Sequence, residues 1–157
     1  GFVGLPPLHG MRVGRSKGMC QIEGYFYPIT PDDFLSLLAN APGLYSIIHR
    51  YAQFANEVIA QSAACNSLHL IEQRCARWLL LTADAVGRKN FGLTQEFLAQ
   101  MLAVRRPGVT VAIGGLERQG LIEQRYGKVL LMDIEGLKQV ACECYGTIAL
   151  KATELLA

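Results

Sequence analysis

Hydrophobic residues recur with a helical period along most of the chain, but the first part lacks that period. Residues 1–41 hold short apolar pieces, Met19–Ile22 and Tyr25–Ile29, separated by glycines, a pattern typical of strands and turns. At Thr30 the pattern changes. A capping hydroxyl, a proline at the first helical position and two acidic residues predict a helix that runs into the apolar FLSLLA.

The longest periodic segment follows Pro42-Gly43, and its apolar or small residues alternate at spacings of four and three until Asn66-Ser67. This heptad spacing predicts one long helix over residues 42–66 whose seam pairs with a second copy of the chain. An amphipathic helix packed on its own domain is the alternative, because a second apolar stripe, Ile47, Phe54, Ile59 and Ala63, lies beside the seam. The predicted dimer contacts are Leu44, Ile48, Tyr51, Ala55, Val58 and Ser62.

Three further helices are predicted in the second half of the chain. The first runs from about Leu70 to Ala83, with Trp78 in the core and Gly87 after its end. The other two lie on either side of a short turn at Ala103-Val104, and Thr94 caps the earlier of them. Two helices joined by so short a turn predict a helix-turn-helix.

The start of the last of these helices carries the side chains that we expect to reach DNA. Helices that cross closely need a small residue at the crossing and apolar anchors behind it, places that Ala99, Val109 and Ala112 fill. Arg105 and Arg106 then lie at the exposed start of the recognition helix. Arg106 is the predicted base contact, because a guanidinium pairs with both major-groove acceptors of guanine, and Arg105 is the predicted phosphate contact.

A two-stranded hairpin is predicted around Tyr126-Gly127. It would be the wing of a winged helix-turn-helix, with Arg125 and Lys128 at its tip binding backbone phosphates. One such cation alone is more often a solvated surface charge, but cations at both the helix start and the wing tip favour DNA. The predicted DNA contacts are Thr94, Gln95, Arg105, Arg106, Thr110, Val111, Arg125 and Lys128.

The distribution of charge agrees with this position of the interface. The formal net charge is only +2, too small to indicate a nucleic-acid partner by itself. Residues 88–128, however, carry seven basic and three acidic side chains, whereas residues 129–157 carry two basic and four acidic ones. The 51% hydrophobic content excludes a disordered chain.

The run TQEFLAQMLAVRRPGVTVAIGGLERQGLI, followed by a short hairpin, resembles the DNA-binding domain of the CRP/FNR regulators. The resemblance extends upstream through IEQRCARWLLLTADAVG and the helix ending QSAACN, and downstream to ACECY, so it covers nearly the whole chain. It implies a parallel dimer seam along the long helix and a homodimer on a pseudo-palindromic operator. It also leaves RNA polymerase open as a further partner.

The stretch GFVGLP, then Arg15-Ser16 and the strands up to Thr30, resembles the last part of the family's cyclic-nucleotide-binding-type β-barrel. This likeness implies a small effector near Gly4, Leu5, Arg15 and Ser16, of which the last two match the pair that grips a cyclic phosphate. Phe2 stands where nucleotide-binding members have a glutamate for the ribose hydroxyl, which favours another effector, or none. The barrel's earlier strands are missing from the sequence, so we expect a fragment of a longer protein.

The sequence gives little support for a metal site, a catalytic nucleophile or a membrane-spanning segment. Five cysteines without a secretory signal indicate reduced cytosolic thiols, and Cys142-x-Cys144 with Cys65, Cys75, His49 and His69 matches no usual zinc spacing. No cysteine or serine is marked as a nucleophile by a neighbouring histidine and a third orienting group. No apolar run is long enough to span a bilayer. We therefore predict a cytoplasmic protein that is not an enzyme and has no cofactor, metal or membrane partner.

The sequence thus predicts an α+β fold that is mainly α. Residues 1–41 would be the C-terminal part of a cyclic-nucleotide-binding-like effector domain with a partial β-barrel, 42–66 the dimerisation helix, and 67–157 the winged helix-turn-helix domain. The predicted function is a homodimeric, sequence-specific DNA-binding transcription regulator, controlled by a cyclic nucleotide or other small effector through the long helix and a hinge at Asn66. The alternative is a winged-helix protein-interaction module without specific DNA binding.

Overall fold

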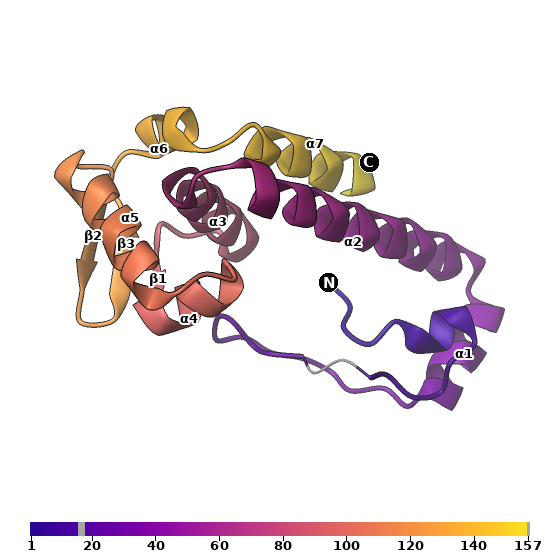
Figure 1. Ribbon diagram of the computed structural model, residues 1–157. Helices are drawn as coiled ribbons and strands as arrows, with labels where there is room; N and C mark the ends of the chain where they lie inside the picture. The colour runs from indigo at the N-terminus through magenta and orange to yellow at the C-terminus, as the bar shows by residue number, and fades with distance from the viewer. Residues whose placement is uncertain (16–17, 157) are drawn as a thin grey trace. The chain divides into compact units, whose positions relative to one another are not determined.

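The computed structural model describes residues 1–15 and 18–156, which divide into two compact units (Figure 1). Unit 1 comprises Gly1–Glu57 together with the segment that begins at Ala152, and unit 2 comprises Val58–Lys151. The described residues are mostly helical, with one small sheet in unit 2, which confirms the α+β, mainly α fold. None of the described helices is both long and apolar enough to cross a membrane.

Unit 1 contains the short 3-10 helix η1 (Pro6–His9), α1 (Pro31–Asn40) and the first part of α2 (Pro42–Leu68). The predicted cap of α1 is confirmed, because the Thr30 hydroxyl oxygen accepts a hydrogen bond from the backbone N–H of Asp33 at 3.2 Å. An apolar cluster holds these elements together. Its buried members and the half-buried residues around them are Phe34, Leu38, Ile48, Leu5, Leu8 and Leu44.

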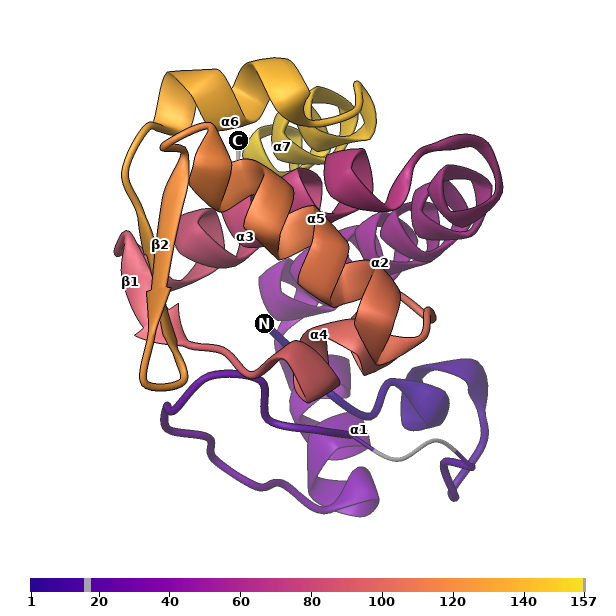
Figure 2. The ribbon, with the colours of Figure 1, turned by 60° about the vertical axis from the view of Figure 1, so that its left-hand side comes forward.

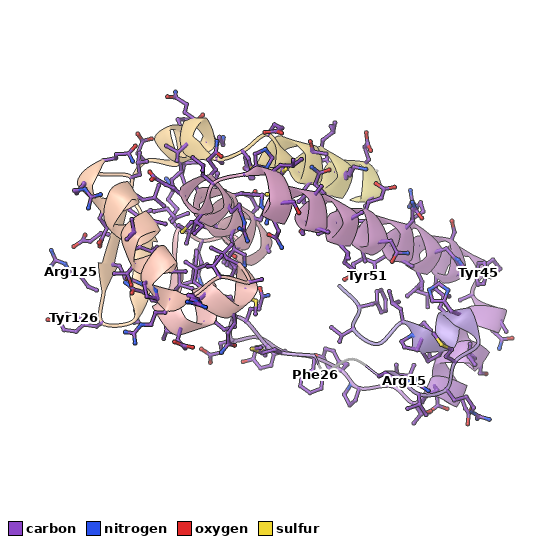
Figure 3. The ribbon with its side chains drawn as sticks, in the orientation of Figure 1. Arg15, Phe26, Tyr45, Tyr51, Arg125 and Tyr126 are labelled. Carbon is purple, nitrogen blue, oxygen red and sulfur yellow. The ribbon has the colours of Figure 1, made fainter. Side chains whose placement is uncertain are left out.

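The strands predicted before Thr30 are absent from the described residues. Met19–Ile22 and Tyr25–Ile29 have irregular backbone, and Phe26 is 85% exposed (Figure 3). A strand needs a neighbour to satisfy its backbone hydrogen-bonding groups, and no described segment pairs with either stretch. The prediction of a partial β-barrel in residues 1–41 is therefore wrong for the described residues of this segment, which contain the predicted apolar side chains but no strand.

The long helix predicted over residues 42–66 is present as α2, but it runs through the expected interruption at Asn66-Ser67 and ends at Leu68. Both polar residues face solvent, so they cost the helix little packing energy. The chain leaves the helical conformation at Leu70, whose φ of −65° and ψ of 152° are extended. The break that we predicted at Asn66 therefore lies about one turn further on.

Unit 2 is built around α3 (Ile71–Val86), which packs against α5 (Arg106–Arg118) and α6 (Ile134–Val140). The glycine predicted to end α3 does so, since Gly87 has a φ of 66° and its N–H donates to the carbonyl of Ala83 at 2.9 Å. After α6 the chain turns into α7 (Cys144–Leu156). The side chains buried by α3 include Cys75, Leu79 and Leu80.

The sheet of unit 2 has three antiparallel strands in the order β1-β3-β2 (Figure 1). β2 (Ile122–Arg125) and β3 (Lys128–Leu131) form the predicted wing hairpin, and β1 (Asn90–Gly92) adds a strand that the sequence pattern did not predict. In this register Phe91 lies opposite Val129, and both side chains are buried. The wing hairpin thus belongs to a sheet whose strands β1 and β3 bury side chains in the core of unit 2.

Candidate nucleic-acid interface

A helix-turn-helix is formed by α4 (Gln95–Met101) and α5, which cross as Figure 2 shows. Thr94 caps α4 as predicted, because its hydroxyl oxygen accepts a hydrogen bond from the N–H of Phe97 at 3.2 Å. The turn contains Ala103 with a φ of 50°, a left-handed conformation that glycine adopts more easily. Ala99 and Val109 are buried at the crossing, as their size and polarity predicted.

The residues at the start of α5 have the exposure that a recognition helix needs. Arg105 is the N-cap residue of α5 and Arg106 is its first residue, and both side chains are exposed. One turn further on, Val111 is 71% exposed although its neighbours Ala112 and Ile113 are buried. An exposed apolar side chain on the same helix as Arg106 is suited to contact a thymine methyl group.

Two of the predicted DNA contacts, Gln95 and Thr110, bind each other. The Thr110 hydroxyl donates to the Gln95 side-chain oxygen at 2.7 Å, and the Gln95 amide nitrogen donates to the side-chain oxygen of Gln124 on β2 at 3.1 Å. The backbone N–H of Gln124 in turn donates to the carboxylate of Glu117 on α5 at 2.9 Å. This chain of hydrogen bonds holds α4, the start of α5 and the wing in one arrangement.

The wing tip carries three exposed side chains. Arg125 and Lys128 lie directly opposite each other in the hairpin register, and Tyr126 lies in the turn with a φ of 50° (Figure 3). Arg125 forms an ion pair with Glu123 on the same strand. Among the described residues, Arg105, Arg106 and Lys128 form no ion pair. These three cations are therefore available to phosphate, whereas Arg125 would have to leave the carboxylate of Glu123 to bind a phosphate.

Sequence reasoning missed the roles of Glu123 and Gln124. Glu123 pairs with Arg125 two residues further along β2, a spacing that places both side chains on one face of the strand. Gln124 bonds to Gln95, which lies 29 residues earlier in the sequence, so this partner is apparent only in three dimensions.

The predicted effector residues are only partly brought together. Unit 1 contains a hollow of about 660 Å³, and Gly4 and Leu5 line it. Arg15 is exposed and does not line this hollow, and Ser16 lies outside the described residues. Most of the other lining residues are apolar and aromatic, and they include Phe2, Tyr25, Phe26, Tyr27 and Phe34.

The predicted dimer residues divide into two sets along α2. Ile48 is completely buried against Phe34 and Leu38, and Leu44 packs on the same cluster, so these two face their own protomer. Tyr51, Ala55, Val58 and Ser62 are half-buried. On the neighbouring stripe, Ile47 is 48% and Ile59 is 67% exposed.

Comparison with known proteins agrees with this architecture. The family model of the Crp-like helix-turn-helix domain matches residues 73–140. The transcriptional regulator SdrP of Thermus thermophilus is 30% identical over 145 residues, which are 90% of this chain and 69% of that regulator. The chain therefore belongs to the CRP/FNR family of transcription regulators.

Solved structures of the same family are also similar. A crystal structure from Eubacterium rectale, assigned to the crp/fnr family of transcriptional regulators, superposes with a TM-score of 0.55 at 16% identity, covering 71% of this chain and 52% of that one. A CRP-family transcriptional regulator from Thermus thermophilus is 28% identical, with a TM-score of 0.48, and covers 54% of this chain and 47% of that one. The chain spans about half the length of these structures.

Proposed function

We propose that this chain binds duplex DNA sequence-specifically as a homodimer, in a transcription regulator that responds to a small effector, and that it has no enzymatic role. The observation that carries the proposal is the hydrogen-bonded chain Thr110–Gln95–Gln124, which holds the wing beside the start of α5. A recognition helix that enters the major groove presents its first residues to the bases, while a wing beside it reaches the flanking phosphates. We assign the start of α5 to the first task and the cations at the wing tip to the second.

Specificity is assigned to Arg106 and Val111, and positioning to Arg105, Arg125 and Lys128. Arg106 is exposed in the first turn of α5, where a guanidinium can pair with guanine O6 and N7. The cations at the N-cap of α5 and at the wing tip bind phosphates, which add affinity but carry no sequence information. Gln95 and Thr110 act first by holding these elements in place, since their polar groups bind each other.

Dimerisation is assigned to the exposed side of α2. Leu44 and Ile48 are occupied within their own protomer, and so is Tyr51, whose hydroxyl donates to the carbonyl oxygen of Phe2 at 3.1 Å. The seam therefore runs along Ile47, Ala55 and Ile59. Half-buried Val58 and Ser62 flank its later part. Two such helices would place two copies of α5 about one helical turn of DNA apart on a pseudo-palindromic operator.

Control by a small effector is assigned to unit 1. It is supported by the hollow of about 660 Å³ in unit 1, a volume within the range of small-molecule sites. Its largely apolar and aromatic lining favours an effector with an apolar body over a cyclic nucleotide.

Fluorescence anisotropy with random and selected duplexes across a salt series tests the DNA part. Affinity that depends on several phosphate contacts should fall steeply as salt rises, and at each salt concentration the selected duplex should bind more tightly than the random one. Arg106→Ala should cost about 1–3 kcal/mol on the selected duplex and relax its sequence preference, whereas Lys128→Ala should weaken both duplexes alike and reduce the salt slope by about one.

Arg50→Ala is the matched control, because it removes an equally exposed arginine from α2, outside the winged helix. It should leave both affinity and preference unchanged. A salt-independent association, or an unchanged sequence preference in Arg106→Ala, would contradict the assignment and favour a protein-interaction module. Sedimentation of Ile59→Asp, which we expect to be monomeric, tests the seam separately.

A further inference from the structure

Three cysteines and a histidine that lie far apart in the sequence meet in unit 2. Cys65 is on the last turns of α2, and His69 follows four residues later, with its N–H donating to the carbonyl of Cys65 at 3.1 Å. Cys142 and Cys144 flank the start of α7, which lies beside the end of α2 (Figure 1). The three sulfur atoms and a ring nitrogen all lie within 4.8 Å of one another. We call these four residues the Cys3His cluster.

We propose that the Cys3His cluster binds one Zn²⁺ ion. Tetrahedral zinc has Zn–S bonds of about 2.3 Å and Zn–N bonds of about 2.0–2.1 Å, so its ligand atoms lie about 3.6–3.8 Å apart. The Sγ atoms of Cys65 and Cys142 are 3.5 Å apart, and Nδ1 of His69 is 3.7 Å from Sγ of Cys144. These separations suit a single ion. A cluster of several irons would hold the cysteines further apart, because irons and sulfides would lie between them.

The histidine is oriented as a metal ligand. Nδ1 of His69 faces the sulfur atoms, and Nε2 lies 3.0 Å from the carboxylate of Glu143. A carboxylate on the distal nitrogen keeps the proton there, which leaves the lone pair of Nδ1 free for a metal. Gln61 adds a donor on the other side, since its amide nitrogen lies 3.0 Å from Sγ of Cys144, where it would stabilise a thiolate.

A buried positive charge also lies next to the cluster. Arg77 is 5% exposed, its Nε has no hydrogen-bond partner, and among the described residues it forms no ion pair. Its Nη1 lies 3.4 Å from the hydroxyl oxygen of Ser62, which is on α2 three residues before Cys65. A buried guanidinium without a carboxylate partner is costly. Zn²⁺ with three thiolates and one neutral imidazole carries a net charge of −1, which would compensate it.

Zinc binding displaces the thiol proton of each cysteine ligand. Each S–H bond is replaced by a Zn–S bond and the proton goes to solvent, with no change of oxidation state. The ion would cross-link the end of α2 to the start of α7, 77 residues further along the chain.

Metal analysis of the full chain tests the proposal. The protein is purified under reducing conditions, incubated with Zn²⁺ and freed of excess metal, and its zinc content is measured by mass spectrometry. We expect about one zinc per chain in the natural protein, and loss of that zinc in Cys142→Ala and Cys144→Ala. Cys75→Ala is the matched control, because Cys75 is equally buried but lies outside the cluster; it should keep its zinc.

Titration of the natural chain with Co²⁺ keeps the proposal testable if the alanine variants fail to fold. We expect the absorption of tetrahedral Co²⁺ with sulfur-to-metal charge transfer, which Zn²⁺ then abolishes. A natural chain that binds neither ion would overturn the proposal. So would zinc retained in both cluster variants, iron with acid-labile sulfide in place of zinc, or a Cys65–Cys142 disulfide as the only state recovered under reducing conditions.

Discussion

Glu72 on α3 accepts a hydrogen bond from the side-chain nitrogen of Gln119, the residue after α5, at 2.7 Å. The same carboxylate lies over Gly115, where a Cβ atom would be 3.1 Å from Oε2 and 3.2 Å from Cδ of Glu72. The two helices thus approach each other closely at a residue that has no side chain. This accounts for one member of the Gly114-Gly115 pair inside the recognition helix.

The two glycines should therefore respond differently to alanine. Gly114→Ala should raise the free energy of unfolding by about 0.5–1 kcal/mol, because a new Cβ there would lie 3.4 Å from the flexible Arg118 side chain and helix propensity improves. The free energy of unfolding of Gly115→Ala should be at least about 1 kcal/mol lower than that of Gly114→Ala, because Glu72 must move and its hydrogen bond to Gln119 is strained. Urea denaturation measures both. Equal stabilities would contradict the close approach, and adding Glu72→Ala should rescue Gly115→Ala.

Gln95 should matter to the fold before DNA is bound. Gln95→Ala removes the hydrogen bonds to Thr110 and Gln124, so we expect the free energy of unfolding without DNA to fall by about 1–2 kcal/mol. Gln100→Ala is the matched control on the same helix, with an exposed side chain, and should be neutral. If Gln95→Ala weakened DNA binding at unchanged stability, Gln95 would be a DNA contact and not a support of the interface.

Glu123 should compete with phosphate for Arg125. Glu123→Gln frees the guanidinium from its ion pair, and we expect affinity for random duplex at low salt to rise about two- to fivefold, with a steeper salt slope. Glu135→Gln breaks an ion pair with Lys138 on α6 and removes the same charge, so it serves as the control. An equal rise in both variants would show that net charge, rather than release of Arg125, is responsible.

The unpredicted strand β1 should carry much of the stability of unit 2. Phe91 is buried, and its ring packs edge-on at 6.5 Å from Trp78. Phe91→Ala should lower the free energy of unfolding by about 3–5 kcal/mol, as measured by circular dichroism together with the fluorescence of Trp78, the chain's single tryptophan. Phe26→Ala, at an exposed ring, should change it by about 0.5 kcal/mol or less.

Thiol reactivity should separate Cys75 from Cys20. Burial, with a smaller contribution from Glu72, raises the pKa of Cys75 to about 12, so its thiol stays protonated and unreactive at pH 8. Cys20 is exposed. Iodoacetamide followed by mass spectrometry should modify Cys20 in the native chain and Cys75 only after denaturation. Modification of both at similar rates would mean that α3 opens far more readily than its packing indicates.

Local signals were sufficient to predict much of unit 2 from the sequence. Thr94 and Gly87 mark helix ends by their own side-chain and backbone chemistry, and Tyr126-Gly127 marks the wing turn. The recognition helix was predictable because Val109 and Ala112 repeat at helical spacing. Such signals need only near neighbours in the sequence.

Features that depend on distant residues were not predictable. β1 is only three residues long and forms by pairing with β3, and the Cys3His cluster joins segments 77 residues apart. Ile48 fits a heptad seam, yet it faces Phe34, because spacing defines a stripe but not the element that covers it. The apolar pieces before Thr30 have strand composition but no described partner.

The chain enters the winged helix-turn-helix on β1 and leaves it on β3, the second strand of the wing, and these two strands are hydrogen-bonded to each other. Two further backbone hydrogen bonds extend this pairing beyond both ends of β1. The N–H of Leu93 donates to the carbonyl of Gly127 at 2.8 Å, and the N–H of Leu131 donates to the carbonyl of Lys89 at 2.9 Å. These hydrogen bonds hold α4, α5 and the wing together, so a force on α3 or α6 cannot unwind α4 or α5 separately. If the chain binds DNA as proposed, an effector signal would change the orientation of α4, α5 and the wing together, either into or out of alignment with the major groove.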